Sequence, residues 1–132
     1  MQITPAFRST DKYGSGEFGA PRGDHSHNGI DFVVAPLQPV LALVEGTVTK
    51  LGYPYTDDLS YRYVQVTDLD GNDVRYFYTL PTVEVGDTIS IGDMLGTAQD
   101  LGERYPGITP HVHLEIKQGR EYLNPNLYFG LL

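Results

Sequence analysis

The sequence has no cysteine among its 132 residues. Disulfide bonds, thiolate nucleophiles and thiolate metal ligands are therefore excluded. No apolar run approaches the length of a membrane span, so we expect no membrane insertion. Residues 1–7 also lack the basic and then apolar pattern of a signal peptide. We expect any exported role to use another route, such as a parent polypeptide, a virion or cell lysis.

Basic residues are also few. The chain has nine Lys and Arg against 17 Asp and Glu, which gives a formal charge of −8 and a pI of about 4.7. The basic residues are scattered and form no stripe, so neither nucleic acid nor an anionic membrane is an expected partner. The acidity itself is typical of a soluble surface.

Turn-forming and aromatic residues, in contrast, are plentiful, with 15 Gly, 9 Pro and 10 Tyr. Such a composition favours short strands joined by tight turns. No segment longer than a few residues repeats its apolar positions with the period of a helix. We predict an all-β fold in a single domain, long enough to bury a core.

We expect this domain to have three parts. They are a Gly-rich N-terminal loop region over 1–26, a core over 27–123 and a C-terminal tail over 124–132. The residues before Ile30 are expected to be irregular, and Pro106 and Pro110 predict a loop before the last main strand. The predicted strands cover 30–35, 40–44, 47–51, the two sides of a hairpin turn at 68–73, short runs around Gly-Asp turns at 86–87 and 92–93, and 111–119.

The four histidines fall into two groups, "HSH" at 25–27 and "HVH" at 111–113. The second group lies in a predicted strand, where alternate side chains share a face. One face of this strand presents the polar side chains of His111, His113 and Glu115. The opposite face, which we expect to point into the core, presents Val112, Leu114 and Ile116. At about 3.3 Å per residue the two imidazoles lie roughly 7 Å apart along the strand, which suits one metal ligand and one neighbour.

Upstream, "HNGID" supplies His27 and Asp31. Three protein ligands with water in the fourth position are typical of catalytic zinc. We predict Zn²⁺ held by His27, Asp31 and His113, with His111 beside it to take a proton from the water. A mixed N/O set without thiolate favours zinc over iron or copper. An HxH pattern alone is weak evidence, and single histidines are usually surface or hydrogen-bonded residues.

At these residues the chain resembles the LytM/lysostaphin-type zinc metallopeptidases. That family carries HxxxD and a distal HxH, which match His27 to Asp31 and His111 to His113 here. "HNGIDF", "VGDTISIGDMLGT" and "HVHLEI" match family blocks in order, and the likeness runs from about Gly14 to Leu127. The resemblance implies a β-sandwich or barrel-like domain of the duplicated-hybrid-motif type, with zinc held by His27, Asp31 and His113, and His111 as a catalytic residue.

Within that family the chain looks most like the leukocyte cell-derived chemotaxin branch, through "YGSGEFGAPRG", "PY" at 54–55, "YFYTLP" and "YPGITPHVHLE". Peptidases of the family usually have a second catalytic histidine in a motif resembling "YxHL", whereas this chain has no histidine between residues 28 and 110. Depending on the register of the match, the position of that second histidine is occupied by Tyr78 or Thr79. We favour Tyr78, since the chemotaxin branch resembles "FY" there and Tyr76 then shares its face. A tyrosine hydroxyl can donate a hydrogen bond to an oxyanion, although a strand tyrosine by default packs on its neighbours. His25 is the other candidate to replace the histidine.

These observations leave three functions open. The first is a zinc endopeptidase acting on peptide cross-links of bacterial peptidoglycan, as the resemblance implies. The second is a zinc-binding or structural module of the same fold without turnover, which is how the chemotaxin branch is generally regarded. The third, a phosphotransfer or carrier domain, lacks the expected glycine loop or lysine hairpin. We expect a phage or bacterial source, and action outside the cell, in the periplasm or in a virion or cell-wall assembly.

Overall fold

The computed structural model describes residues 21–22, 25–26 and 29–125, and side chains from Gly29 onward. Twelve strands and one 3₁₀ turn form this part of the chain. Their bounds are β1 Pro21–Arg22, β2 His25–Ser26, β3 Ile30–Val33, β4 Pro39–Leu41, β5 Gly46–Gly52, β6 Tyr63–Asp68, β7 Asp73–Phe77, β8 Thr79–Pro81, β9 Thr88–Ile89, β10 Met94–Ala98, η1 Leu101–Glu103, β11 His111–Gln118 and β12 Glu121–Leu123.

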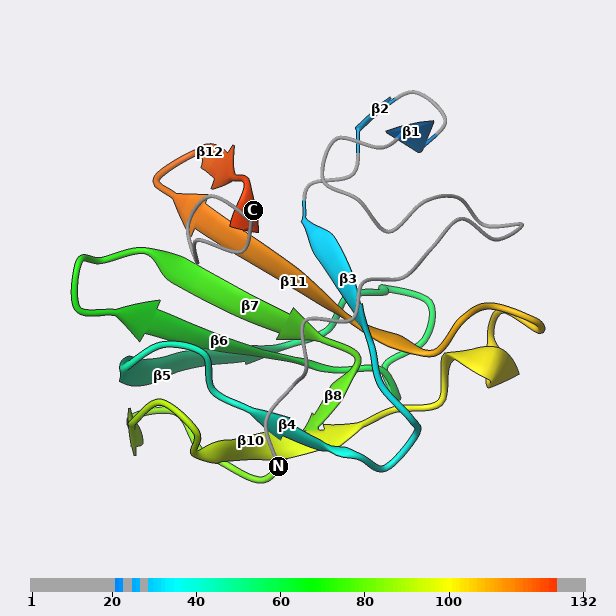
Figure 1. Ribbon diagram of the computed structural model, residues 1–132, viewed down its shortest axis with the longest axis horizontal. Helices are drawn as coiled ribbons and strands as arrows, with labels where there is room; N and C mark the ends of the chain where they lie inside the picture. The colour runs from blue at the N-terminus through cyan, green and yellow to red at the C-terminus, as the bar shows by residue number, and fades with distance from the viewer. Residues whose placement is uncertain (1–20, 23–24, 27–28, 126–132) are drawn as a thin grey trace.

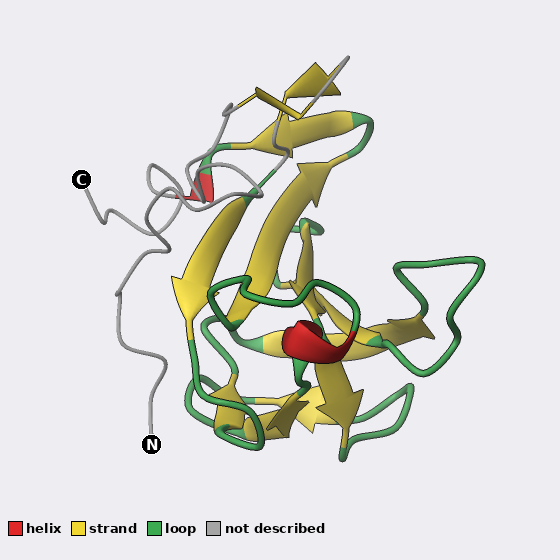
Figure 2. Ribbon diagram, turned by 90° about the vertical axis from the view of Figure 1, so that its right-hand side faces the viewer, coloured by secondary structure: helices red, strands yellow, loops and turns green. Residues whose placement is uncertain are grey.

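Two sheets carry the fold (Figure 1). The larger has the order β12-β11-β7-β6-β5-β9, and β3 pairs with β11 beside this path. The smaller has the order β4-β10-β8. All pairings are antiparallel. Figure 2 shows that strands dominate the molecule and that η1 lies among loops outside the sheets. The predicted all-β class is confirmed.

The core lies between these sheets because alternate residues of each strand point inward. In β11 the predicted apolar face, Val112, Leu114 and Ile116, is fully buried. It joins one cluster with residues of both sheets, among them Val40, Val66 and Leu95. Burial of such side chains is worth roughly 1.5–3 kcal/mol each.

The hairpin predicted around 68–73 is present as β6 and β7, with Gly71 at a φ of 85° in the turn. The Gly-Asp turns also have the expected left-handed glycines, Gly86 and Gly92. Such φ values cost glycine little, since it has no Cβ.

Several predicted boundaries are wrong. The first core strand ends at Val33, and the next covers Pro39–Leu41. The residues before Ile30 are not wholly irregular, because β1 pairs with β2. The loop before β11 contains η1, whose first turn is capped by Asp100. Short apolar runs predict that a strand exists better than where it ends, because hydrogen-bond partners set its limits.

Candidate metal centre and active site

Asp31 and His113 are brought together by the pairing of β3 with β11, in which they are directly opposed. The Nδ1 atom of His113 lies 2.8 Å from Oδ1 of Asp31. Asp31 is 1% exposed and His113 9%. A buried carboxylate beside a buried imidazole forms a strongly polar point in this strand pair.

His111 lies beside the other oxygen of the Asp31 carboxylate. Its Nε2 lies 3.4 Å from Oδ2 of Asp31, and its Nδ1 lies 2.7 Å from the carbonyl oxygen of Thr109. A carbonyl only accepts hydrogen bonds, so Nδ1 carries the hydrogen and Nε2 is the basic nitrogen of the neutral ring. The strand spacing of about 7 Å is therefore bridged by one aspartate, which both imidazoles face.

Glu115 completes the predicted polar face of β11. Its Oε2 lies 3.2 Å from Nε2 of His113, on the opposite side of the ring from Asp31. Burial opposes the charge on the imidazole, but its hydrogen bonds to Asp31 and Glu115 outweigh burial and raise the pKa of His113 to about 9. A histidine ligand commonly donates its second ring nitrogen to a carboxylate in this way, which fixes the ring and increases its basicity.

The donor chemistry of this pair fits zinc. A carboxylate oxygen of Asp31 and an imidazole nitrogen of His113 lie side by side, and zinc accepts both kinds of ligand. Among the described residues no set of three or more His, Asp or Glu could hold a metal ion. The third predicted ligand, His27, lies outside the described residues. His25 lies in β2, but its side chain is not described.

Tyr78, not Thr79, lies beside the histidines. Its ring meets that of His111 edge to face, with centroids 5.5 Å apart. Thr79 is fully buried, and in the described chain its hydroxyl makes no hydrogen bond. The expectation that Tyr78 shares a face with Tyr76 is wrong. Tyr76 points into the core and bonds the Leu43 amide, whereas the φ of Tyr78 is 63°, which turns its side chain away from the strand alternation.

The hydroxyl of Tyr78 has a defined partner. Tyr55 donates a hydrogen bond of 3.3 Å to its oxygen, so the proton of Tyr78 is left to point elsewhere. Burial raises the pKa of Tyr78 to about 12, with the hydrogen bond from Tyr55 acting in the opposite direction. Tyr78 is therefore a neutral donor at physiological pH.

Arg104 ties together the two loops that flank this tyrosine pair. Its guanidinium lies 3.7 Å from the ring centroid of Tyr55 and forms an ion pair of 3.2 Å with Asp57. Its Nε also donates to the hydroxyl of Tyr105. These contacts join the loop before β6 to the loop before β11, so both loops hold Tyr55 in place.

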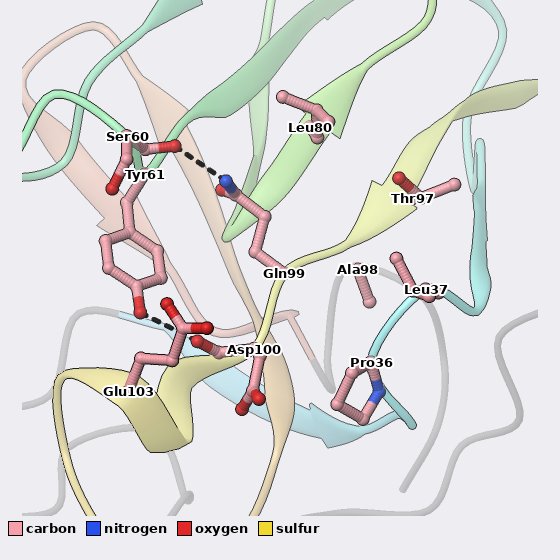
Figure 3. Close-up of a pocket in the computed structure, with 10 residues that line it drawn as sticks. All are labelled: Pro36, Leu37, Ser60, Tyr61, Leu80, Thr97, Ala98, Gln99, Asp100 and Glu103. Carbon is pink, nitrogen blue, oxygen red and sulfur yellow. Dashed lines mark hydrogen bonds between the residues drawn. The ribbon is translucent and has the colours of Figure 1, made fainter.

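A hollow of about 380 Å³ lies next to these loops (Figure 3). Tyr61 and Gln99 line it, held by hydrogen bonds to the Asp100 and Ser60 carbonyls. Tyr61 also packs edge to face on Tyr78, at 6.3 Å between centroids. Its lining includes no predicted site residue, so the hollow is separate from the histidines.

Sequence reasoning missed several residues of the site. Glu115 was placed on the right face, but its bond to His113 was not predicted. Tyr55 and Arg104 act through contacts across 23 and 47 residues, to Tyr78 and Asp57 respectively. The only signal available was the "PY" shared with the chemotaxin branch. Loop residues show no periodicity from which such contacts could be inferred.

Residues 25–125 match the model of Peptidase family M23. Mouse leukocyte cell-derived chemotaxin-2 is 32% identical over 108 residues, which cover 82% of this chain and 71% of the relative.

Among solved structures, the catalytic domain of the antimicrobial peptidase lysostaphin from Staphylococcus simulans superposes with a TM-score of 0.68 and 22% identity, covering 89% of this chain and 90% of that domain. A structure of lysostaphin itself gives a TM-score of 0.73 and 20% identity over 97% of this chain. The match covers 55% of the lysostaphin chain, so our chain spans about half its length. Similarity at this level of identity establishes the fold.

Proposed function

This chain belongs to Peptidase family M23, and we propose that it is a zinc-dependent endopeptidase that hydrolyses peptide cross-links of bacterial peptidoglycan. The observation that carries the proposal is the shared carboxylate of Asp31, faced by His113 at 2.8 Å and by His111 at 3.4 Å. Such a substrate places the protein outside the cell membrane, in the periplasm or in a virion or cell-wall assembly.

The residues divide the chemistry between them. Asp31, His113 and His27 would hold zinc, which when bound supplies Lewis-acid activation of water and of the scissile carbonyl. His111 directs its Nδ1 to the carbonyl of Thr109, so in the neutral ring Nε2 is the nitrogen that would act as the general base. Glu115 keeps His113 in the orientation that directs Nδ1 toward Asp31.

Tyr78 would stabilise the negative charge that develops on the carbonyl oxygen. Its ring packs against His111, and its hydroxyl oxygen already accepts from Tyr55, so its own hydrogen is available for donation. This replaces the second histidine of the family by a neutral donor. A preorganised donor of this kind contributes about 10²–10³ in rate.

A second candidate function is supported by the same tyrosine. Tyr78 would take the place of a catalytic histidine, and the chain is 32% identical to a chemotaxin relative. The alternative is a zinc-binding module of the M23 fold that recognises a partner without hydrolysing it.

Zinc content and hydrolysis of cross-linked muropeptides distinguish these functions. The wild-type protein should contain about one zinc per chain and release cleaved peptides. His113→Ala should lose zinc, and His111→Ala should retain most of it while losing turnover. Zinc binding without turnover by the wild type would favour the binding module, and absence of zinc from the wild type would contradict both.

A further inference from the structure

A row of aromatic rings extends from the histidines across one face of the larger sheet. The register aligns His113 with Phe77 and Phe77 with Tyr63 on neighbouring strands. The Phe77 ring lies 5.1 Å from that of His113 and 4.8 Å from that of Tyr63, measured between centroids. Tyr63 lies flat over Gly52, where a Cβ would come within 2.2 Å of the ring. The rings form a continuous surface that starts at the metal site.

Two cationic side chains lie at the end of this row of rings that is farther from the histidines, next to Tyr63. The guanidinium carbon of Arg75 lies 5.5 Å from the Tyr63 centroid, and Nζ of Lys50 lies 5.8 Å from it. Neither side chain forms an ion pair with another described residue. Two unpaired cations gathered on one ring are unexpected in a chain with a formal charge of −8.

Arg75 is held by a chain of side-chain hydrogen bonds. Its Nε donates to Oε1 of Gln65 at 2.8 Å, and Nε2 of Gln65 donates to Oγ1 of Thr49 at 3.0 Å. Gln65 is buried, with 8% of its surface exposed. The anchoring uses only Nε, so the two terminal nitrogens of the guanidinium remain available as a pair of parallel donors.

A β-bulge in β5 brings Lys50 to the same place. The register with β6 shifts between Val48 and Lys50, and Thr49 is the extra residue. Thr49 bonds Gln65, and the next residue, Lys50, reaches Tyr63 on the same face. In a regular strand two successive side chains would point to opposite faces, so the bulge is what allows both contacts.

The acidic neighbours on this face are engaged elsewhere. Glu115 is opposite Arg75 in the register, but its carboxylate bonds His113. Asp73, one row further along, accepts from the hydroxyl of Thr67. Among the residues that the structure describes, neither cation therefore has a carboxylate of its own.

We propose that Arg75 and Lys50 form a subsite for a carboxylate of the peptide substrate, which rests on the proposed endopeptidase function. Arg75 lies two residues before Phe77 in β7, and Phe77 is opposite His113. Arg75 and the Phe77–His113 pair are therefore about 7 Å apart along the strand. An extended peptide spans this distance in about two residues. The substrate is therefore an anionic peptide with a free carboxylate about two residues from the scissile bond, and the rings of Phe77 and Tyr63 lie beneath the peptide between the two.

The first test is the turnover of a matched pair of cross-linked stem peptides, one with free carboxylates and one with these converted to carboxamides. The wild type should prefer the acid. Arg75→Gln should lower kcat/KM for the acid by about tenfold to hundredfold, as for loss of a charge-assisted hydrogen bond, and leave the amide nearly unchanged. Lys50→Gln should have a smaller effect of the same kind. Arg120→Gln, which removes an exposed cation from the β11–β12 turn, is the matched control and should keep the preference.

The second test does not need turnover. Binding of the same two peptides to His111→Ala protein, measured by calorimetry, should favour the acid, and adding Arg75→Gln should remove the difference. Arg75→Lys keeps the charge, should retain part of the preference, and controls for damage to the fold. Equal affinity for acid and amide, or an equal loss in Arg120→Gln, would overturn the subsite. Preferential binding without hydrolysis would support the subsite and contradict the endopeptidase.

Discussion

At the scale of the residue, the backbone conformation of Tyr78 decides which side chain lies beside His111. A positive φ is uncommon for a bulky side chain and costs of order 1–3 kcal/mol when the surroundings impose it. Here it occurs where the chain leaves β7 of the larger sheet and enters β8 of the smaller one. The turn directs the ring of Tyr78 toward His111, while Thr79 faces the core.

Tyr78→Phe and Thr79→Val should therefore behave oppositely. Loss of the Tyr78 hydroxyl should lower kcat by about 10²–10³, because one oxyanion donor is removed, and zinc content should not change. Thr79→Val should keep activity and leave the free energy of unfolding equal or higher, because it removes a buried hydroxyl that makes no hydrogen bond. Steady-state kinetics and urea unfolding measure the two effects. Full activity in Tyr78→Phe would mean that this hydroxyl does not touch the transition state.

The structure places Tyr78, not Thr79, beside His111, but one of the two reasons for favouring Tyr78 from the sequence, the face shared with Tyr76, was wrong. Simple alternation would have placed Tyr78 on the face of Tyr76, in the core. The left-handed backbone that reverses this is set by the passage between sheets, a tertiary feature with no local signal. The faces of β11 were predictable because alternation there is uninterrupted from His111 to Ile116.

At the scale of the element, the site depends on how closely β3 approaches β11. Gly29 precedes β3, and a Cβ at this position would lie 2.0 Å from the carbonyl oxygen of Leu114. The obstacle is backbone, which cannot turn aside as a side chain can. The glycine within "HNGID" is thus a packing requirement of the strand pair.

Gly29→Ala should separate β3 from β11 and pull Asp31 away from His113. We expect zinc content to fall by more than half and the melting temperature to drop by several degrees. Gly102→Ala is the control, because the nearest atom to a Cβ there is a side-chain oxygen of Asp100 at 3.0 Å. Metal analysis and thermal unfolding of both variants would decide, and normal zinc content in Gly29→Ala would rule out the close approach as a requirement.

The strands themselves were largely predictable, and their partners were not. The β6–β7 hairpin follows from a local turn, whereas β3 finds β11 across most of the chain. Local patterns cannot specify such a pairing, which the whole core stabilises.

At the scale of the whole molecule, a zinc ion held as proposed would compete with a proton for the imidazole of His113. No helix of the described residues is long and apolar enough to cross a membrane. The pKa of His113 is raised to about 9 without metal, against an ordinary value of about 6.5. Zinc requires this ring unprotonated.

Zinc should therefore stabilise the fold more as the pH rises. Without metal, the protonated His113 stabilises the folded state fully below pH 6.5, and this contribution is lost as the pH rises through about 9. The stabilisation by zinc has the opposite pH dependence and increases as the pH rises, because fewer protons compete for the His113 ring. The difference in melting temperature between zinc-loaded and EDTA-treated protein should grow from pH 6 to pH 8.5, reaching about 5–10 °C at a hundredfold excess of zinc over its Kd.

His113→Ala supplies the control, since it should show almost no difference at any pH. A difference that shrinks with rising pH in the wild type would mean that another group controls metal release.

The 82 residues that separate Asp31 from His113 also set when the site can exist. Closing so long a loop is slow and must precede any gain from the contact. During synthesis the aspartate emerges early, but its partner is made only near the end of the described chain. A nascent chain or a fragment that stops short of β11 lacks the partner of Asp31, so the proposed metal would be acquired only after the strands on which its site depends have been assembled.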